Sequence, residues 1–112
     1  MNISTTTTIE LEATENTPAE RITVRAYMAD RCEGIVPRFD IVHAIAGGPG
    51  LELETVRTDE SMKAGDVRAF LVSALPLPAD DDEVTARIDR RSFAYGLVDH
   101  LTETAFAIGY YR

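Results

Sequence analysis

The sequence predicts an α+β fold, a mainly antiparallel sheet of about four strands with helices on one face, in the element order β-β-α-β-α-β-α. Two neighbouring segments near the N-terminus alternate apolar with polar residues, as half-buried strands do. Later segments repeat apolar residues every three or four positions, as amphipathic helices do. The chain has 112 residues, which is the size of one domain, so we expect a single compact domain over residues 1–112.

The first two elements are predicted to be strands that pair as a hairpin. Residues 6–13 and 21–28 each alternate apolar and polar positions. The short connection between them contains Asn16 and Pro18, which favour a turn. Antiparallel pairing is therefore expected. Residues 1–5 are polar and are expected to be frayed.

A helix followed by a third strand is predicted next. Pro37 suits the first turn of a helix, where its missing N–H is not needed. The apolar residues that follow at helical spacing are Phe39, Val42, Ile45 and Ala46. Gly47 and Gly48 are expected to end this helix, with a positive φ at one of them. Residues 51–57 alternate again and are predicted to form a strand.

The remaining elements are predicted to be a helix, a short strand and a long helix. Residues 67–75 have helical spacing, although their many β-formers leave a buried strand as the alternative. Residues 76–83 are expected to form an acidic surface linker, and residues 84–88 a short fourth strand. The last helix is expected over residues 92–109. Its predicted buried side is Phe93, Leu97, Leu101, Ala105 and Ile108.

The composition limits the classes of partner. Nineteen Asp and Glu residues against eleven Lys and Arg residues give a net charge of −8, which disfavours direct binding to nucleic acid. Only Lys63 is a lysine, and such a composition is typical of a halophilic or high-GC source. An acidic nucleic-acid mimic that inhibits a DNA- or RNA-handling protein is the alternative interpretation of the charge.

The compartment is predicted from the cysteine content and the lack of targeting segments. Cys32 is the single cysteine, which excludes an internal disulfide and fits a reducing compartment. The N-terminal sequence lacks the apolar region of a secretory signal. No apolar run reaches the length of about eighteen residues that a membrane span needs. We expect a cytoplasmic protein that does not enter a membrane.

Five residues are candidates for chemistry. His43 and His100 each have a carboxylate nearby in the sequence, Asp40 and Asp99, and would form a small enzyme or ligand-binding site if two helices brought them together. Cys32 would become a nucleophile only beside one of these histidines. No HxxxH, HExxH or GxSxG spacing supports catalysis. The sequence therefore leans away from an enzyme, and no metal or cofactor is expected.

The glycine-rich stretch at residues 44–54 reads AIAGGPGLELE and is predicted to be a helix cap followed by a turn. A phosphate loop normally precedes a helix, whereas here a predicted helix precedes the glycines. Neither GxGxxG nor GxxxxGK[ST] is present, so no cofactor-binding role is assigned to these residues.

Aromatic and arginine residues are the candidates for partner binding. Tyr110, Tyr111 and Arg112 end the chain, and Tyr27 adds a further aromatic residue. These residue types are enriched at protein interfaces. The sequence therefore favours a small noncatalytic binding or regulatory module that contacts a protein partner or itself, with a homo-oligomer expected.

Overall fold

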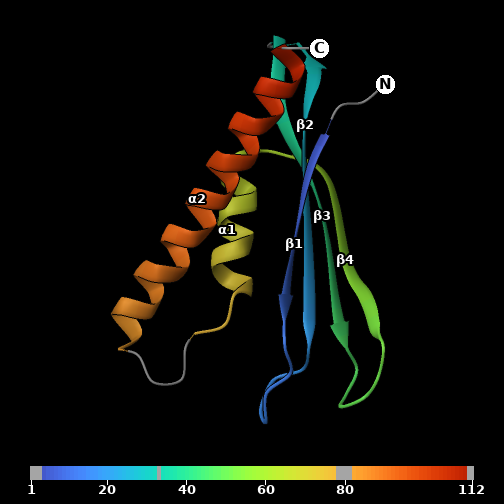
Figure 1. Ribbon diagram of the computed structural model, residues 1–112, viewed down its shortest axis with the longest axis vertical. Helices are drawn as coiled ribbons and strands as arrows, with labels where there is room; N and C mark the ends of the chain where they lie inside the picture. The colour runs from blue at the N-terminus through green and yellow to red at the C-terminus, as the bar shows by residue number, and fades with distance from the viewer. Residues whose placement is uncertain (1–3, 33, 78–81, 111–112) are drawn as a thin grey trace.

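The computed structural model describes residues 4–32, 34–77 and 82–110. Its elements are β1 (Ser4–Leu11), β2 (Glu20–Arg31), β3 (Gly34–Ala46), β4 (Leu53–Met62), α1 (Ala64–Ala74) and α2 (Glu83–Tyr110). The four strands form one antiparallel sheet in the order β1-β2-β3-β4. Both helices lie on the same side of this sheet (Figure 1). The predicted α+β class, with an antiparallel four-stranded sheet, is confirmed.

The β1–β2 hairpin follows directly from its alternating sequence. Ile9 pairs with Ile22 on the side that faces the helices, and Glu10 pairs with Arg21 on the opposite side, which we call the open face. The Glu10 carboxylate lies 3.1 Å from the Arg21 guanidinium. At the turn, the Thr14 hydroxyl accepts a hydrogen bond from the backbone N–H of Thr17.

The core lies between the helices and the inner face of the sheet. From the sheet it takes Ile22, Val24, Ala26, Phe39 and Ile41. From the helices it takes Val67, Phe70 and Leu71 of α1, and Ala94, Val98, Leu101 and Ala105 of α2. α1 packs on β3, whereas α2 packs on α1, β2 and β1. α2 thus contributes two alanines, a valine and a leucine to this core.

The predicted helix that begins near Pro37 is wrong, because residues 34–46 form strand β3. The apolar residues of this segment fit both the period of two of a strand and the spacing of three or four of a helix. Phe39 and Ile41 alternate onto the inner face, while Val42 lies on the open face and mimics a helical step. Pro37 is tolerated because β4 ends at Met62, opposite Phe39, so beside Pro37 one edge of β3 has no strand to bond.

The predicted strand at residues 84–88 is also wrong, because these residues form the first turns of α2. The order is therefore β-β-β-β-α-α, with two helices in the described residues instead of three. Residues 67–75, for which a strand was the alternative, fall within α1 and at its C-terminal cap. Of the predicted linker 76–83, residues 78–81 lie outside the described residues and Glu83 already belongs to α2.

The N-terminal and glycine predictions need smaller corrections. β1 begins at Ser4, inside the segment expected to be frayed, and residues 1–3 lie outside the described residues. The positive φ of the glycine-rich turn is at Gly50, +75°, and not at Gly47 or Gly48. The turn closes with a hydrogen bond from the Leu51 N–H to the Gly48 carbonyl, 3.1 Å, and it follows a strand instead of capping a helix.

Candidate functional site

Asp40 lies at the centre of a polar network on the open face of the sheet. Its Oδ1 accepts hydrogen bonds from the Tyr27 hydroxyl and from the backbone N–H of Ser61, each 3.0 Å long. Its Oδ2 is paired with the Arg25 guanidinium. The same guanidinium lies 4.7 Å from the centre of the Tyr27 ring. β2, β3 and β4 each supply part of this network.

The network sets the ionisation of its members. Partial burial alone would raise the pKa of Asp40, but the hydrogen bonds from Arg25, the Ser61 N–H and Tyr27 outweigh it and lower that pKa. Burial, followed by the hydrogen bond to Asp40, raises the pKa of Tyr27. At neutral pH Asp40 is therefore ionised and Tyr27 is protonated. A carboxylate held in this way is a weak proton acceptor, so the network serves structure better than catalysis.

What the network holds is a bulge in β4. The pairing of β3 with β4 shifts register between Phe39 and Ile41, so that β4 has one extra residue opposite Asp40. Ser61, in this bulge, has a φ of +57°, which is rare for a residue with a side chain. The bond from its N–H to Asp40 helps to keep this backbone conformation.

His43 lies on the opposite face of β3 from Asp40. It pairs with Ile22 in the sheet register and packs edge-on against Phe70 of α1, with the ring centres 5.6 Å apart. Its Nε2 is 2.9 Å from a carboxylate oxygen of Glu20. The predicted pairing of His43 with Asp40 required a helix, and the strand separates the two side chains onto different faces.

The second predicted pair, His100 and Asp99, is also not formed as expected. Asp99 of α2 forms an ion pair with Arg68 of α1, and Arg68 lies over the Tyr95 ring at 5.1 Å. The His100 side chain is exposed on α2, where its backbone carbonyl accepts a hydrogen bond from the Thr104 hydroxyl. The predicted pairing of His100 with Asp99 thus gives way to an interhelical ion pair.

Cys32 is exposed in the turn that joins β2 to β3. Gly34 lies beside this turn, and His43 is nine residues further along β3. At the rise of an extended strand this separation is about 30 Å, so His43 is too far away to activate the thiol. Within the described ranges, no group of three or more His, Cys, Asp and Glu side chains has the arrangement of a metal site.

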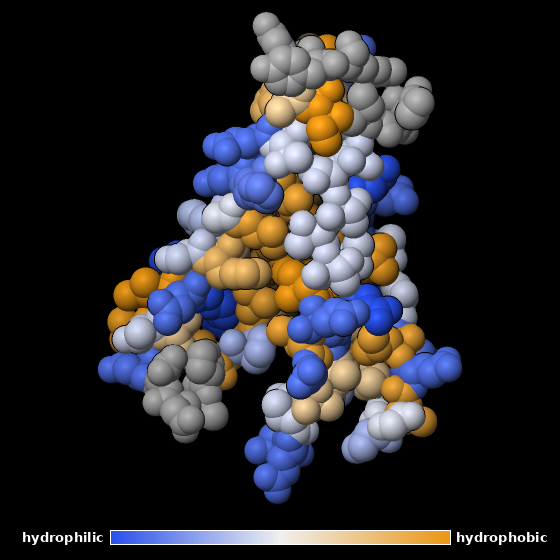
Figure 2. Space-filling view, in the orientation of Figure 1, coloured by the Kyte–Doolittle hydropathy of each residue, from blue (hydrophilic) through white to orange (hydrophobic). Residues whose placement is uncertain are grey.

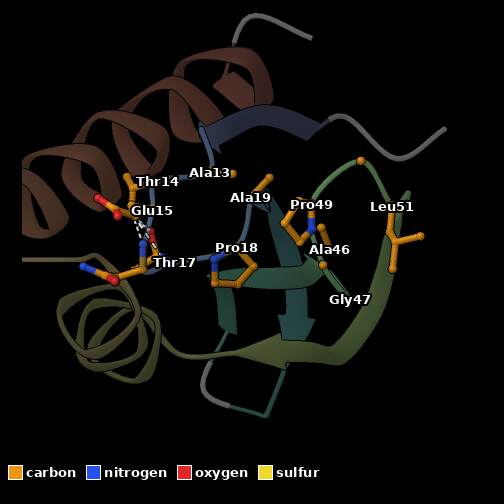
Figure 3. Close-up of a pocket in the computed structure, with 13 residues that line it drawn as sticks. Ala13, Thr14, Glu15, Thr17, Pro18, Ala19, Ala46, Gly47, Pro49 and Leu51 are labelled. Atoms are coloured by element: carbon orange, nitrogen blue, oxygen red, sulfur yellow. Dashed lines mark hydrogen bonds between the residues drawn. The ribbon is translucent and has the colours of Figure 1, made fainter.

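A cavity of about 430 Å³ lies between the β1–β2 loop and the β3–β4 loop (Figure 3). Its walls are mainly alanine, glycine and proline residues of the two loops. The backbone N–H of Ala46 donates a hydrogen bond to the carbonyl oxygen of Ala19 and so joins the two sides. Glu15 is the one ionisable side chain among the described residues that line it. The described residues of these walls supply no positively charged side chain, and the carboxylate of Glu15 would repel an anion.

The residues predicted to bind a partner are placed only in part. Tyr27 belongs to the Asp40 network. Tyr110 is the last residue of α2. Tyr111 and Arg112 lie outside the described residues, so the prediction that they bind a partner stays a prediction.

α2 carries large apolar side chains that the core does not cover, which sequence reasoning missed. Val84, Ile88, Tyr95 and Phe106 are exposed to 64%, 58%, 49% and 48%. Val84, Tyr95 and Phe106 are eleven residues apart, about three turns, and Ile88 is seven residues before Tyr95. They therefore follow one side of the helix, which we call the outer stripe. Figure 2 shows hydrophobic side chains at the N-terminal end of α2.

Two signals in the sequence point to these features. The alternation in residues 38–45 puts Asp40 on the same face as Arg25 once β2 and β3 are paired in register. The eleven-residue spacing of Val84, Tyr95 and Phe106 is a helical period that extends into the predicted strand at residues 84–88.

Comparisons of the chain with protein-family models, with curated proteins and with solved structures find no match. None of the helices in the described parts of the chain is both long and apolar enough to cross a lipid bilayer.

Proposed function

We propose that the chain is a small, acidic, noncatalytic binding module that acts through protein–protein contacts, including contacts with copies of itself. The outer stripe of α2 is the observation that carries the proposal. Four large apolar side chains aligned on one side of a helix, outside the core, are typical of a surface that a partner covers. A groove or a second amphipathic helix fits a stripe of this shape.

The ion pairs of the polar side chains support this function over the two alternatives. An enzyme using His43 and His100 with Asp40 and Asp99 would need them together, whereas Asp40 is held by Arg25 and Asp99 by Arg68. A nucleic-acid mimic would need an array of carboxylates without neighbouring cations. Instead, further carboxylates are matched with arginine, as in Glu10–Arg21, Asp59–Arg57 and Glu83–Arg87.

The strength expected of the outer stripe is modest. Covering a half-exposed Val, Ile, Tyr or Phe contributes about 1 kcal/mol, so the four together supply about 4 kcal/mol. Association costs at least that much in lost translational and rotational freedom. The stripe alone therefore supports only weak binding, and a stable assembly needs a second contact surface.

The setting that we propose is the cytoplasm. The chain has a single cysteine, Cys32, and this thiol is exposed. In a reducing compartment it stays free, whereas in an oxidising one it would form mixed disulfides.

Sedimentation velocity over a hundredfold range of protein concentration tests the function. We expect a weight-average mass that rises above the 12.3 kDa of one chain. Ile88→Ala should weaken association at least about threefold, because it removes half-exposed apolar surface from the stripe. Thr85→Ala is the matched control, since Thr85 is exposed on α2 but lies off the stripe. A monomer at every concentration would contradict the proposed self-association.

A further inference from the structure

β1 is an edge strand whose outer side pairs with no other strand in the described part of the chain. Natural proteins usually protect such an edge with charges, proline, a bulge or a covering segment. From Ser4 to Ile9 the strand has no charged residue, glycine or proline, and its pairing with β2 shows no register shift from Ser4 to Leu11. Figure 2 shows the side chains along β1 uncovered, with hydrophobic side chains between β1 and α2.

The opposite edge of the sheet, β4, is protected. Its pairing with β3 shifts register at two places, so the strand is irregular. Its middle carries the charged residues Arg57, Asp59 and Glu60. Bulges and charges are the features that prevent a second chain from adding to an edge. The two edges thus differ in the way expected if one pairs and the other does not.

We propose that β1 pairs antiparallel with β1 of a second copy, so that two four-stranded sheets join into one eight-stranded sheet. The inference rests on the proposed function, since it assumes that the chain associates with itself. The β1 edge is a contact surface separate from the outer stripe, which stays available for a further contact.

The uncharged centre of β1 allows a second copy to occupy this edge. With the two-fold axis at Thr7, residues equally far on either side of Thr7 lie opposite one another, so that Thr6 faces Thr8 and Thr5 faces Ile9. Glu10 then faces Ser4 of the second copy instead of the other Glu10. Because each chain carries a net charge of −8, an uncharged centre avoids the repulsion that would otherwise oppose association.

The position of α2 fits the same arrangement. α2 packs on both β1 and β2, so it lies on the side of the sheet core nearest the edge where the second copy would join. The α2 helices of the two copies would then lie next to each other on the same face of the joined sheet, where helices can pack directly.

One side of α2 has the pattern of a helix contact at this place. The side turned away from Arg68 and α1 carries Phe93, Leu97, His100 and Thr104, at spacings of four, three and four. Phe93 is 48% exposed in the single chain and would be covered by the second copy. The outer stripe, which includes Tyr95 beneath Arg68, lies on the other side and stays open.

A cysteine scan tests the pairing. In a Cys32→Ser background, which removes the only native thiol, single cysteines are placed by Thr6→Cys, Thr7→Cys and Thr8→Cys. Thr58→Cys, an exposed position on β4, is the matched control. Mild oxidation followed by non-reducing electrophoresis measures disulfide-linked dimers, and light scattering of Cys32→Ser measures the mass in solution. We expect one β1 position to crosslink at least about tenfold faster than Thr58→Cys, because only residues near the two-fold axis face themselves.

The outcomes separate this inference from the proposed function. A dimer that crosslinks at β1 supports both. An oligomer that crosslinks no faster at β1 than at Thr58→Cys overturns the inference and leaves self-association standing. A monomer at every concentration overturns both. Phe93→Ala is expected to raise the dimer dissociation constant about fivefold through lost contact with the second copy, and an unchanged constant would refute the proposed contact between the α2 helices.

Discussion

Replacing Asp40 by Asn tests whether the polar network of the open face stabilises the fold. The change keeps the shape of the side chain but removes the charge that pairs with Arg25. The Asp40 side chain is only 20% exposed, so solvent replaces little of the lost interaction. A hydrogen bond to a charged group contributes about 1.5–3 kcal/mol, and Asn keeps one acceptor for Ser61 or Tyr27. We therefore expect a loss of about 2 kcal/mol in the free energy of unfolding.

The pH dependence gives this prediction a second, independent readout. The pKa of Asp40 is lowered in the folded chain, so its ionised form stabilises the fold above the pKa of the unfolded chain, about 4. This stabilisation is lost as the pH falls through the lower, folded pKa. The difference between the wild type and Asp40→Asn should therefore be constant from pH 7 to 5 and shrink below about pH 4.

Urea unfolding followed by circular dichroism at several pH values measures both effects. At neutral pH the midpoint of Asp40→Asn should fall by about 1 M urea. Glu10→Gln is the control, because Glu10 pairs with Arg21 at an exposed position, and it should change the unfolding free energy by less than about 0.5 kcal/mol. A loss below about 0.5 kcal/mol for Asp40→Asn, or a difference that is the same at pH 3 and pH 7, would refute the reasoning.

Three glycine substitutions give further predictions from backbone geometry. Gly50→Ala should destabilise the chain by about 1 kcal/mol in urea unfolding, because φ is +75° there, whereas Gly48→Ala should change little, since its new Cβ would lie at an ordinary 3.5 Å from Leu51; equal effects at the two positions would contradict the assignment of the positive φ. Gly96→Ala should raise the unfolding free energy by about 0.5–1 kcal/mol, because Gly96 lies within α2 with no atom near its missing Cβ; a lower melting temperature would show that the residue is packed against something.

The strands that the sequence predicts correctly are those with one face exposed to solvent. β1 and β2 alternate cleanly because their open-face positions are threonine, arginine and glutamate, so their apolar residues identify the inner face without ambiguity. β3 has apolar Val42 and Ala44 on the open face as well, whereas β2, the other central strand, has mostly polar residues there. Apolar residues on both faces remove the period of two, and helical spacing then fits by coincidence.

The long helix shows a different limit of periodic reasoning. The predicted stripe steps mainly by four residues, and each such step turns about 40° beyond a full circle. Two such steps lead from Leu101 back to Phe93, and the accumulated rotation turns Phe93 away from the core. Its side chain is therefore half exposed. The buried set is Ala94, Val98, Leu101 and Ala105, which mixes steps of four and three. Small alanines gave this face a weak signal in the sequence.

The predicted site depended on the same error, a strand interpreted as a helix. Pairing His43 with Asp40 assumed a helix from Pro37 to Ala46, and one wrong period placed two residues on one face that a strand puts on opposite faces. The Arg25–Asp40 pair is a cross-strand contact, and it becomes predictable only when the register of β2 with β3 is known.

The irregular β4 sets a limit on the size of any assembly built through the sheet. A sheet with two regular edges can recruit copies without end and grow into a fibre. When one edge is bent at Ser61 and carries charged side chains, joining at the other edge leaves no regular edge at which the sheet can grow further. The proposed pairing would therefore stop at two chains. The Asp40 network, by holding the bend in place, would then act as a safeguard against fibril formation.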